Sequence, residues 1–266
     1  MRVVAGTIVA VIVVAALLAA VWTPYPVDGF DMADRFALPS LAHPLGTDQY
    51  GRDVVSMLMA GASTSLGVAA GAILIGVGLG GPLGLAAASS GRVGRAVLML
   101  GGDIVFAFPA LIVAAMLTTF RGPGAVNAMV AIGIFYIPVF MRLVAASARR
   151  ILSLDFVDAA RLSGKGRSRI AFEHVAPLVA PIVLTQAATQ FAVAILIEAG
   201  LSYVGLGAQP PAVSWGRMLA EAQTLIALAP QLALWPGLAI AVTVLAITTL
   251  GEALNRRLDP RFVRPA

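Results

Sequence analysis

Apolar residues run along this chain in long stretches, and polar residues gather between them. A helix that crosses about 30 Å of hydrocarbon needs roughly 20 apolar residues, and six stretches reach that length. They lack the two-residue alternation of membrane strands. We therefore predict an all-α fold, a polytopic membrane helix bundle with six transmembrane helices: Val3–Trp22, Leu66–Ala88, Val97–Phe120, Ala125–Ala146, Pro181–Tyr203 and Gln231–Leu250.

Glycine and proline interrupt several of these stretches. Pro109 and Pro138 lie within predicted spans, which membrane helices tolerate because neighbouring groups satisfy the freed backbone. Gly76, Gly80 and Gly84 recur every four residues, and that spacing lets another backbone approach closely. The sequence leaves open whether this glycine row serves packing within the chain or a special role.

Composition supports a membrane protein. The chain has 266 residues, of which 59% are hydrophobic and 12% are charged, whereas soluble domains carry about 25% charged residues. The absence of cysteine excludes disulfides and thiolate metal sites. The chain has a net charge of +5, and almost all of its lysines and arginines lie in the loops beside apolar stretches, so we expect a lipid bilayer as partner and no nucleic acid.

The cations also predict an orientation. With a cytoplasmic N-terminus, fourteen of the 18 lysines and arginines fall inside and four fall outside, as the positive-inside rule requires. Both chain ends would then be cytoplasmic. An alternative is that Arg2 and the first stretch form a signal peptide, which would leave five spans; the stretch is long for that role and "AAVWTPYP" is a poor cleavage site.

These predictions divide the chain into consecutive parts. The parts are a first span at 1–22, an extracytoplasmic segment at 23–62, a membrane core at 63–252 that includes a cytoplasmic loop at 149–177, and a cytoplasmic tail at 253–266.

The loop at 149–177 contains the stretch "DAARLSGKGRSRIAFEHVAP". Ser153 is expected to cap a short helix, with Asp155 in its first turn near the positive helix end. Gly164 follows where a left-handed residue would end that helix. A helix this short is unstable alone, so the loop predicts a helix that packs against something else.

Two kinds of partner fit this helix equally well on its residues. Ala159 and Ala160 permit close approach of another surface, and Phe156 and Leu162 can anchor on it. Its cations can bind either acidic side chains of a protein or anionic lipid headgroups.

The loop resembles the EAA loop of importer permeases of the ATP-binding-cassette class. That loop reads Glu-Ala-Ala, three residues, Gly, nine residues, then hydrophobic-x-Leu-Pro. Here Asp158-Ala159-Ala160, Gly164 and His174-Val175-Ala176-Pro177 stand at those positions, with Asp for Glu, His at 174 and Ala for Leu. The stretches His43–Leu66 and Glu198–Ala222 resemble segments of the second, "C"-type permease of dipeptide and oligopeptide importers, and a nickel importer has a similar subunit.

The resemblance implies the type I importer permease fold and a bacterial inner-membrane location. It also implies a second homologous permease, two ATPase subunits or domains, and an extracytoplasmic substrate-binding protein. ATP and Mg would be used by the ATPases, and this chain would bind no cofactor and would not be an enzyme. The EAA helix would dock in an ATPase groove through Asp155, Phe156, Asp158, Ala159, Ala160, Arg161, Leu162, Gly164 and Lys165.

Two acidic residues lie within predicted spans, where charge is costly and often functional. For Asp103 and Glu198 we leave open a structural ion pair or cap and a contact with substrate or the partner permease. The external stretches 45–53 and 205–215 either receive the binding protein or pack on the bundle. His43 and His174 fall on opposite sides of the membrane, so they cannot form one metal site.

Three functions remain to be weighed. The first is a peptide importer permease, with nickel or another small solute as the alternative cargo. The second is a stand-alone secondary transporter, a class that commonly shows inverted repeats, and the sequence has no such repeat. The third is a membrane hydrolase, for which the sequence lacks a plausible set of catalytic residues; "GVGLGGPLG" also lacks the lysine of a phosphate-binding loop.

Overall fold

Long apolar helices account for most of the computed structural model, which describes residues 2–258. Within that range the extended pairing is one isolated bridge between Thr47 and Asp53. The α-helices are α1 (Arg2–Ala19), α2 (Val54–Ser89), α3 (Arg92–Phe106), α4 (Ala110–Arg121), α5 (Ala125–Leu152), α6 (Asp155–Leu162), α7 (Arg167–Ile170), α8 (Ala176–Tyr203), α9 (Trp215–Ala222) and α10 (Gln231–Leu258). Short 3₁₀ turns η1 (Met32–Asp34) and η3 (Gln223–Leu225) and the π-helical turn η2 (Ala171–Val175) complete them.

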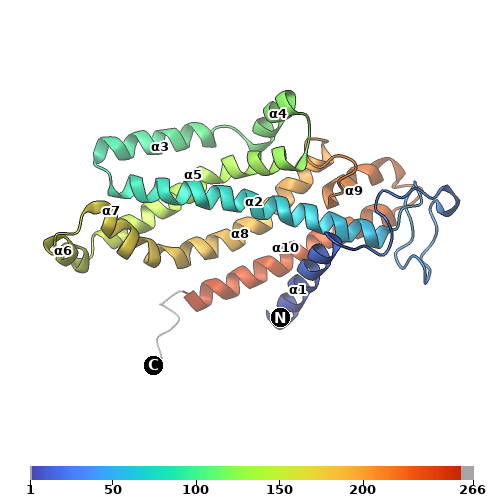
Figure 1. Ribbon diagram of the computed structural model, residues 1–266, viewed down its shortest axis with the longest axis horizontal. Coiled ribbons are helices and arrows are strands. Elements are labelled where there is room, and N and C mark those ends of the chain that lie inside the picture. The colour runs from blue at the N-terminus through green and yellow to red at the C-terminus, as the bar shows by residue number, and fades with distance from the viewer. Residues whose placement is uncertain (1, 259–266) are drawn as a thin grey trace.

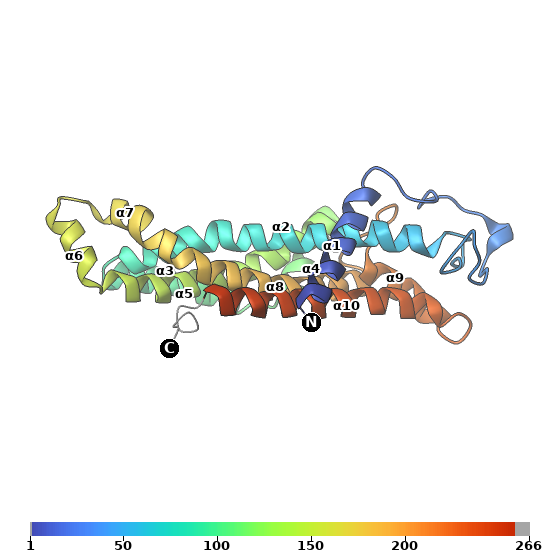
Figure 2. The ribbon, with the colours of Figure 1, turned by 90° about the horizontal axis from the view of Figure 1, so that it is seen from below.

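The long helices lie along one axis. Figures 1 and 2 show α2, α5, α8 and α10 running together, with α3 beside α5 and α1 crossing at the edge. α2 packs on both α5 and α8, and α1 packs on α2 and α10. α6 and α7 form one end of the molecule, whereas α9 and the segment between α1 and α2 form the other end.

The predicted third span is broken in the structure. Within the described residues, five helices are long and apolar enough to cross a membrane, and the bent pair α3–α4 gives a sixth if it counts as one span. The two helices meet at 76°, so the prediction of one continuous helix at Val97–Phe120 is wrong. Pro109 explains the break, because it lacks an N–H and disfavours helical geometry at Phe108.

Four helices, α2, α5, α8 and α10, extend beyond the predicted spans, and α2 and α10 do so the furthest. α2 begins at Val54 rather than Leu66, because the Asp53 carboxylate caps it by accepting a hydrogen bond from the Ser56 N–H at 2.8 Å. Its 36 residues reach about 54 Å, so one end must leave the hydrocarbon. α10 continues past Leu250 to Leu258, so it takes up the start of the predicted tail, and residues 259–266 lie outside the described part.

The glycine row on α2 faces α5. A Cβ on Gly84 would lie 2.6 Å from the Met141 carbonyl oxygen, and one on Gly80 would collide with the Ile137 carbonyl. The two backbones therefore approach more closely than any side chain would allow. Of the two roles that the sequence left open, the structure supports packing within the chain.

A small apolar cluster secures the end of the bundle that carries α6. It joins α2, α5, α6, α7, η2 and α8 through Leu85, Val144, Ala148, Val157, Ile170, Val175 and Val179. This cluster is the physical support on which the short helix of the EAA-like loop rests.

Candidate coupling site and external polar network

α6 begins without the cap that its sequence predicts. Leu154 occupies the N-cap position and contributes no side-chain hydrogen bond. The Ser153 hydroxyl instead donates to the Arg150 carbonyl at 2.8 Å, so the predicted Ser153 cap is wrong. Asp155 and Asp158 lie in the first turn, where their negative charge is favourable beside the positive helix end.

Gly164 ends α6 as predicted. Its φ of +80° is left-handed, and its N–H donates to the Arg161 carbonyl at 2.9 Å. The Lys165 N–H donates to the Ala160 carbonyl at 3.2 Å. These two bonds form a Schellman motif, which satisfies the last carbonyls of the helix and turns the chain sharply.

The two faces of α6 have different environments. Val157 is fully buried in the apolar cluster described above, and Ala160 is half-buried against it. On the other side Ala159 and Phe156 are exposed, and Leu162 is 89% exposed. The adjacent alanines are therefore divided, since Ala160 packs on this chain and Ala159 faces outward.

Ion pairs hold several of the charged residues of the loop. Arg161 donates to Asp158 at 2.8 Å, with both side chains more than half exposed. The Lys165 ammonium lies 2.7 Å from Glu173 and 2.9 Å from His174, so it is held against η2. Glu173 was missed by the sequence analysis.

Arg169 also binds Glu173, at 2.6 Å. Their four-residue separation on a helical stretch was the signal that could have identified this carboxylate. The predicted residues Asp155 to Lys165 thus gather at one end of the molecule, with Lys165 turned toward this chain rather than outward.

Asp103 on α3 forms an ion pair with Arg142 on α5 at 2.5 Å. The two side chains are 57% and 43% exposed, and the guanidinium also lies 4.9 Å from the centre of the Phe106 ring. The sequence left open a structural ion pair or a contact with substrate or the partner permease for Asp103, and the structure contains the ion pair. It lies on an uncovered face of the isolated chain.

Glu198 lies far from the EAA-like loop, at the opposite end of α8. It is 1% exposed, and the Ser202 hydroxyl donates to one of its carboxylate oxygens at 2.6 Å. Its other oxygen has no hydrogen-bond partner among the described residues. The Ala208 N–H donates to the Ser202 hydroxyl at 3.1 Å, so Glu198 and Ser202 support the loop that leads to α9.

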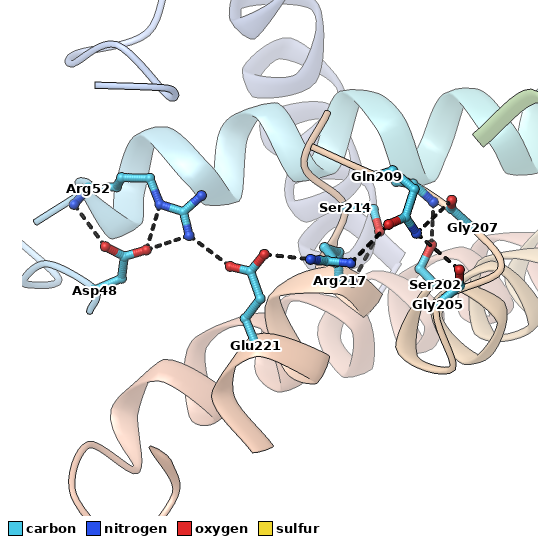
Figure 3. A network of polar contacts seen from close by, with 10 residues as sticks. Asp48, Arg52, Ser202, Gly205, Gly207, Gln209, Ser214, Arg217 and Glu221 are labelled. Atoms are coloured by element: carbon cyan, nitrogen blue, oxygen red, sulfur yellow. Dashed lines mark hydrogen bonds and ion pairs between the residues drawn. The ribbon is translucent and has the colours of Figure 1, made fainter. Parts of the chain in front are cut away.

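A polar network joins three separate segments at this end (Figure 3). Arg52 donates to Asp48 at 2.6 Å and to Glu221 of α9 at 2.7 Å. Arg217 donates to the other Glu221 oxygen at 2.9 Å and to Gln209 at 3.2 Å. The network connects the segment before α2, the loop after α8, and α9.

The network holds its central cation in the charged form. Burial of Arg52 acts to lower the pKa of its guanidinium, but attraction and hydrogen bonds from Asp48 and Glu221 outweigh burial and raise that pKa above its ordinary value. This network was not predicted from the sequence. Only the four-residue spacing of Arg217 and Glu221 signalled part of it.

A cavity of about 350 Å³ borders the network between the segment before α2 and the start of α9. Arg52, Arg217 and Glu221 line it together with Pro210 and Pro211. The two external stretches suggested by the sequence are thus brought together into one surface. Their packing on one another is observed, and a role in receiving a binding protein stays a prediction.

The two histidines lie at opposite ends of the molecule. The His43 ring lies 3.0 Å from the Asp53 carboxylate and stacks near Tyr25, whereas His174 lies beside Lys165. Among the described residues, no group of three or more His, Cys, Asp or Glu side chains has the arrangement of a metal site.

Comparison with known proteins finds one matching family and many similar chains. Residues 80–264 match the family described as "Binding-protein-dependent transport system inner membrane component". The glutathione transport system permease protein GsiD of Pectobacterium atrosepticum is 36% identical over 259 residues, which cover 97% of this chain and 86% of that protein. The nickel transport system permease protein NikC of Escherichia coli is 34% identical, over 96% of this chain and 92% of that one.

A solved structure shares the fold. One chain of the MetNI methionine ABC transporter, described as inward-facing, superposes with a TM-score of 0.65 over 76% of this chain and 96% of that chain. The sequences are 16% identical, so this likeness concerns the fold alone. It supports the prediction of a type I importer permease fold.

Proposed function

This chain belongs to the family of binding-protein-dependent transport system inner membrane components, and on that premise we propose that it serves an ATP-driven importer of di- and oligopeptides. In this proposal it forms the translocation path with a second, homologous permease. It receives motion from two ATPase subunits or domains through α6 and receives substrate from an extracytoplasmic binding protein.

The outward face of α6 carries the coupling part of the proposal. Leu162 is 89% exposed, and Phe156 and Ala159 are exposed beside it, at the end of the molecule where cations concentrate. Apolar side chains gain stability by leaving water, and the small Ala159 side chain allows a partner surface to come close. Docking in an ATPase groove would bury this exposed apolar face of α6.

Packing of α6 on the long helices would let it transmit motion to them. Its inner face packs through Val157 into the cluster that joins α2, α5 and α8. A displacement of α6 by a closing ATPase pair would therefore be transmitted to three of the long helices. Such a docked helix makes the state of the bundle depend on nucleotide, and binding of substrate would in turn influence nucleotide binding.

The Asp103–Arg142 pair favours a second permease on the α3–α5 face. Both side chains are exposed in the single chain, and charge exposed to lipid is costly. Packing of a partner permease or a water-filled path against this face would remove that cost. We propose that ATP and Mg are bound by the ATPases and that this chain binds no cofactor.

The cargo is proposed from two observations. The segments 43–66 and 198–222 resemble those of peptide permeases, and glutathione, named for one relative, is a short peptide. The relative named for nickel supplies the alternative of nickel or another small solute. Uptake of labelled dipeptide and of nickel by cells with and without this gene would distinguish them.

The coupling proposal is tested by Ala159→Arg, with Ser168→Arg on the exposed side of α7 as the control. A long cation at position 159 would block close approach, so we expect the purified complex to lose its ATPase subunits and uptake to fall more than tenfold. The control is expected to retain both. Normal uptake by the Ala159→Arg variant would refute docking through α6.

A further inference from the structure

A cavity of about 640 Å³ opens between the EAA-like loop and the bundle. Its lining residues place it at the end of the molecule formed by α6 and α7, an end whose ribbon Figure 2 shows. The end of α2 and the last turn of α5 form one side, and the connection between α6 and α7 forms the other. The apolar part of its lining comes from Ala88, Leu152 and Ile170.

The charged side chains that line this cavity are all cations: Arg149, Arg161, Lys165 and Arg167. Arg161 and Lys165 share their charge with Asp158 and Glu173. No ion pair involves Arg149 or Arg167 among residues 2–256. The cavity therefore keeps a positive charge that no side chain of the described part neutralises.

The start of α3 adds to this charge. Gly91 lines the cavity and occupies the N-cap position of α3, where it provides no side-chain hydrogen bond. The positive end of a helix of 15 residues therefore lies beside the same space. Four cations and a helix start from three separate segments converge here.

We propose that this cavity binds a phosphate group, carried either by the headgroup of an anionic phospholipid or by a soluble phosphate. Guanidinium groups donate paired hydrogen bonds that match phosphate oxygens. The apolar floor and the position at the cation-rich end of the bundle favour the lipid, since basic pockets between membrane helices take anionic headgroups.

A bound phosphate would connect the loop to the bundle. Arg149 belongs to α5, Arg161 to α6, and Arg167 to the start of α7. An anion held by these three would fix α6 against the long helices. Coupling would then respond to the anionic lipid content of the membrane.

The test compares Arg149→Gln/Arg167→Gln with Arg150→Gln, which removes a neighbouring exposed cation outside the cavity lining. The full-length chain is purified with its co-expressed subunits and titrated with phosphatidylglycerol, phosphatidylcholine and inorganic phosphate. Native mass spectrometry counts the bound molecules, so the readout does not depend on transport. The double lysine variant Arg149→Lys/Arg167→Lys checks that charge is what matters.

We expect phosphatidylglycerol to bind the unaltered protein and the Arg150→Gln control equally well. It should bind the glutamine double variant at least tenfold more weakly, and the lysine double variant should recover part of the lost affinity. Phosphatidylcholine should bind weakly throughout. Inorganic phosphate that binds in the same residue-dependent way, without phosphatidylglycerol, would uphold the phosphate site with a soluble source.

Two results would overturn the proposal. The first is equal binding of phosphatidylglycerol and of phosphate to the unaltered protein and the glutamine double variant. The second is binding of neither phosphatidylglycerol nor inorganic phosphate to the unaltered protein, because the cavity would then hold no phosphate group. Neither result bears on docking through the outer face of α6, which Ala159→Arg tests separately.

Discussion

At the scale of single residues, Gly164 has a left-handed backbone conformation that residues other than glycine rarely adopt. Its φ is +80°, whereas Gly166, two residues later, has an extended conformation that any residue adopts. Neither position has an atom within 4 Å of an added Cβ. A difference between alanine variants at the two positions would therefore report backbone conformation and not crowding.

Gly164→Ala is expected to weaken the end of α6 by about 1 kcal/mol, the cost of a left-handed non-glycine residue. Gly166→Ala replaces no left-handed residue, so it should leave the end of α6 unchanged. Hydrogen exchange of the amides in residues 159–165 would measure the effect, with faster exchange in the first variant. Equal exchange in the two variants would contradict the need for a left-handed glycine at the end of α6.

Arg52 is the second residue with a clear energetic role. Arg52→Ala would leave the Asp48 and Glu221 carboxylates without their shared cation, at a cost of about 2 to 4 kcal/mol. The exposed Arg35 on the same segment provides the control, Arg35→Ala, which should change stability by less than about 1 kcal/mol. Thermal unfolding of the purified protein measures both, and a similar midpoint for the two variants would count against the network.

At the scale of elements, the contact between α2 and α5 depends on the absence of side chains. A Cβ on Gly84 would meet the Met141 backbone at 2.6 Å and the Val144 side chain at 2.8 Å. Backbone atoms of a packed helix cannot move aside as a flexible side chain can. The helices would have to separate.

Gly84→Ala should therefore destabilise the protein by about 1 to 3 kcal/mol through overpacking. Gly78→Ala lies on the exposed side of the same helix with open space around it, so it should have little effect. Thermal unfolding in detergent distinguishes the two. An unchanged midpoint for Gly84→Ala would show that the helices approach less closely than described.

At the scale of the whole molecule, the two ends differ in charge. The end with α6 and α7 carries a dense group of cations from the start of α3, the end of α5, α6 and α7, and the end with α9 carries the network around Arg52. The positive-inside rule predicts that the first end is cytoplasmic. The asymmetry is large enough to predict one orientation.

The chain has no cysteine, so single cysteines report this orientation without background. Ser40→Cys and Ser163→Cys introduce exposed thiols at the two ends. We expect an impermeant maleimide to label position 40 in intact cells and position 163 only after the membrane is opened. The reverse pattern would invert the predicted topology.

Local physics explains what could be predicted from sequence. Apolar length against bilayer thickness identified the spans, and steric freedom at Gly164 identified the end of α6. The Ser153 cap failed because that hydroxyl bonds backward to Arg150. The continuous third span failed because Pro109 falls where the helix then bends by 76°.

The sequence by itself determined that lipid is the main solvent of this protein, which ends bear the cations, and where a short helix must stop. Those properties follow from composition and from the conformational limits of single residues. Only the tertiary structure decided that Ala160 turns inward while Ala159 faces outward, and that Arg52 meets Glu221 across 169 residues of chain. Such contacts depend on how distant helices pack, because a side chain finds its partner only after the bundle has brought the two segments together.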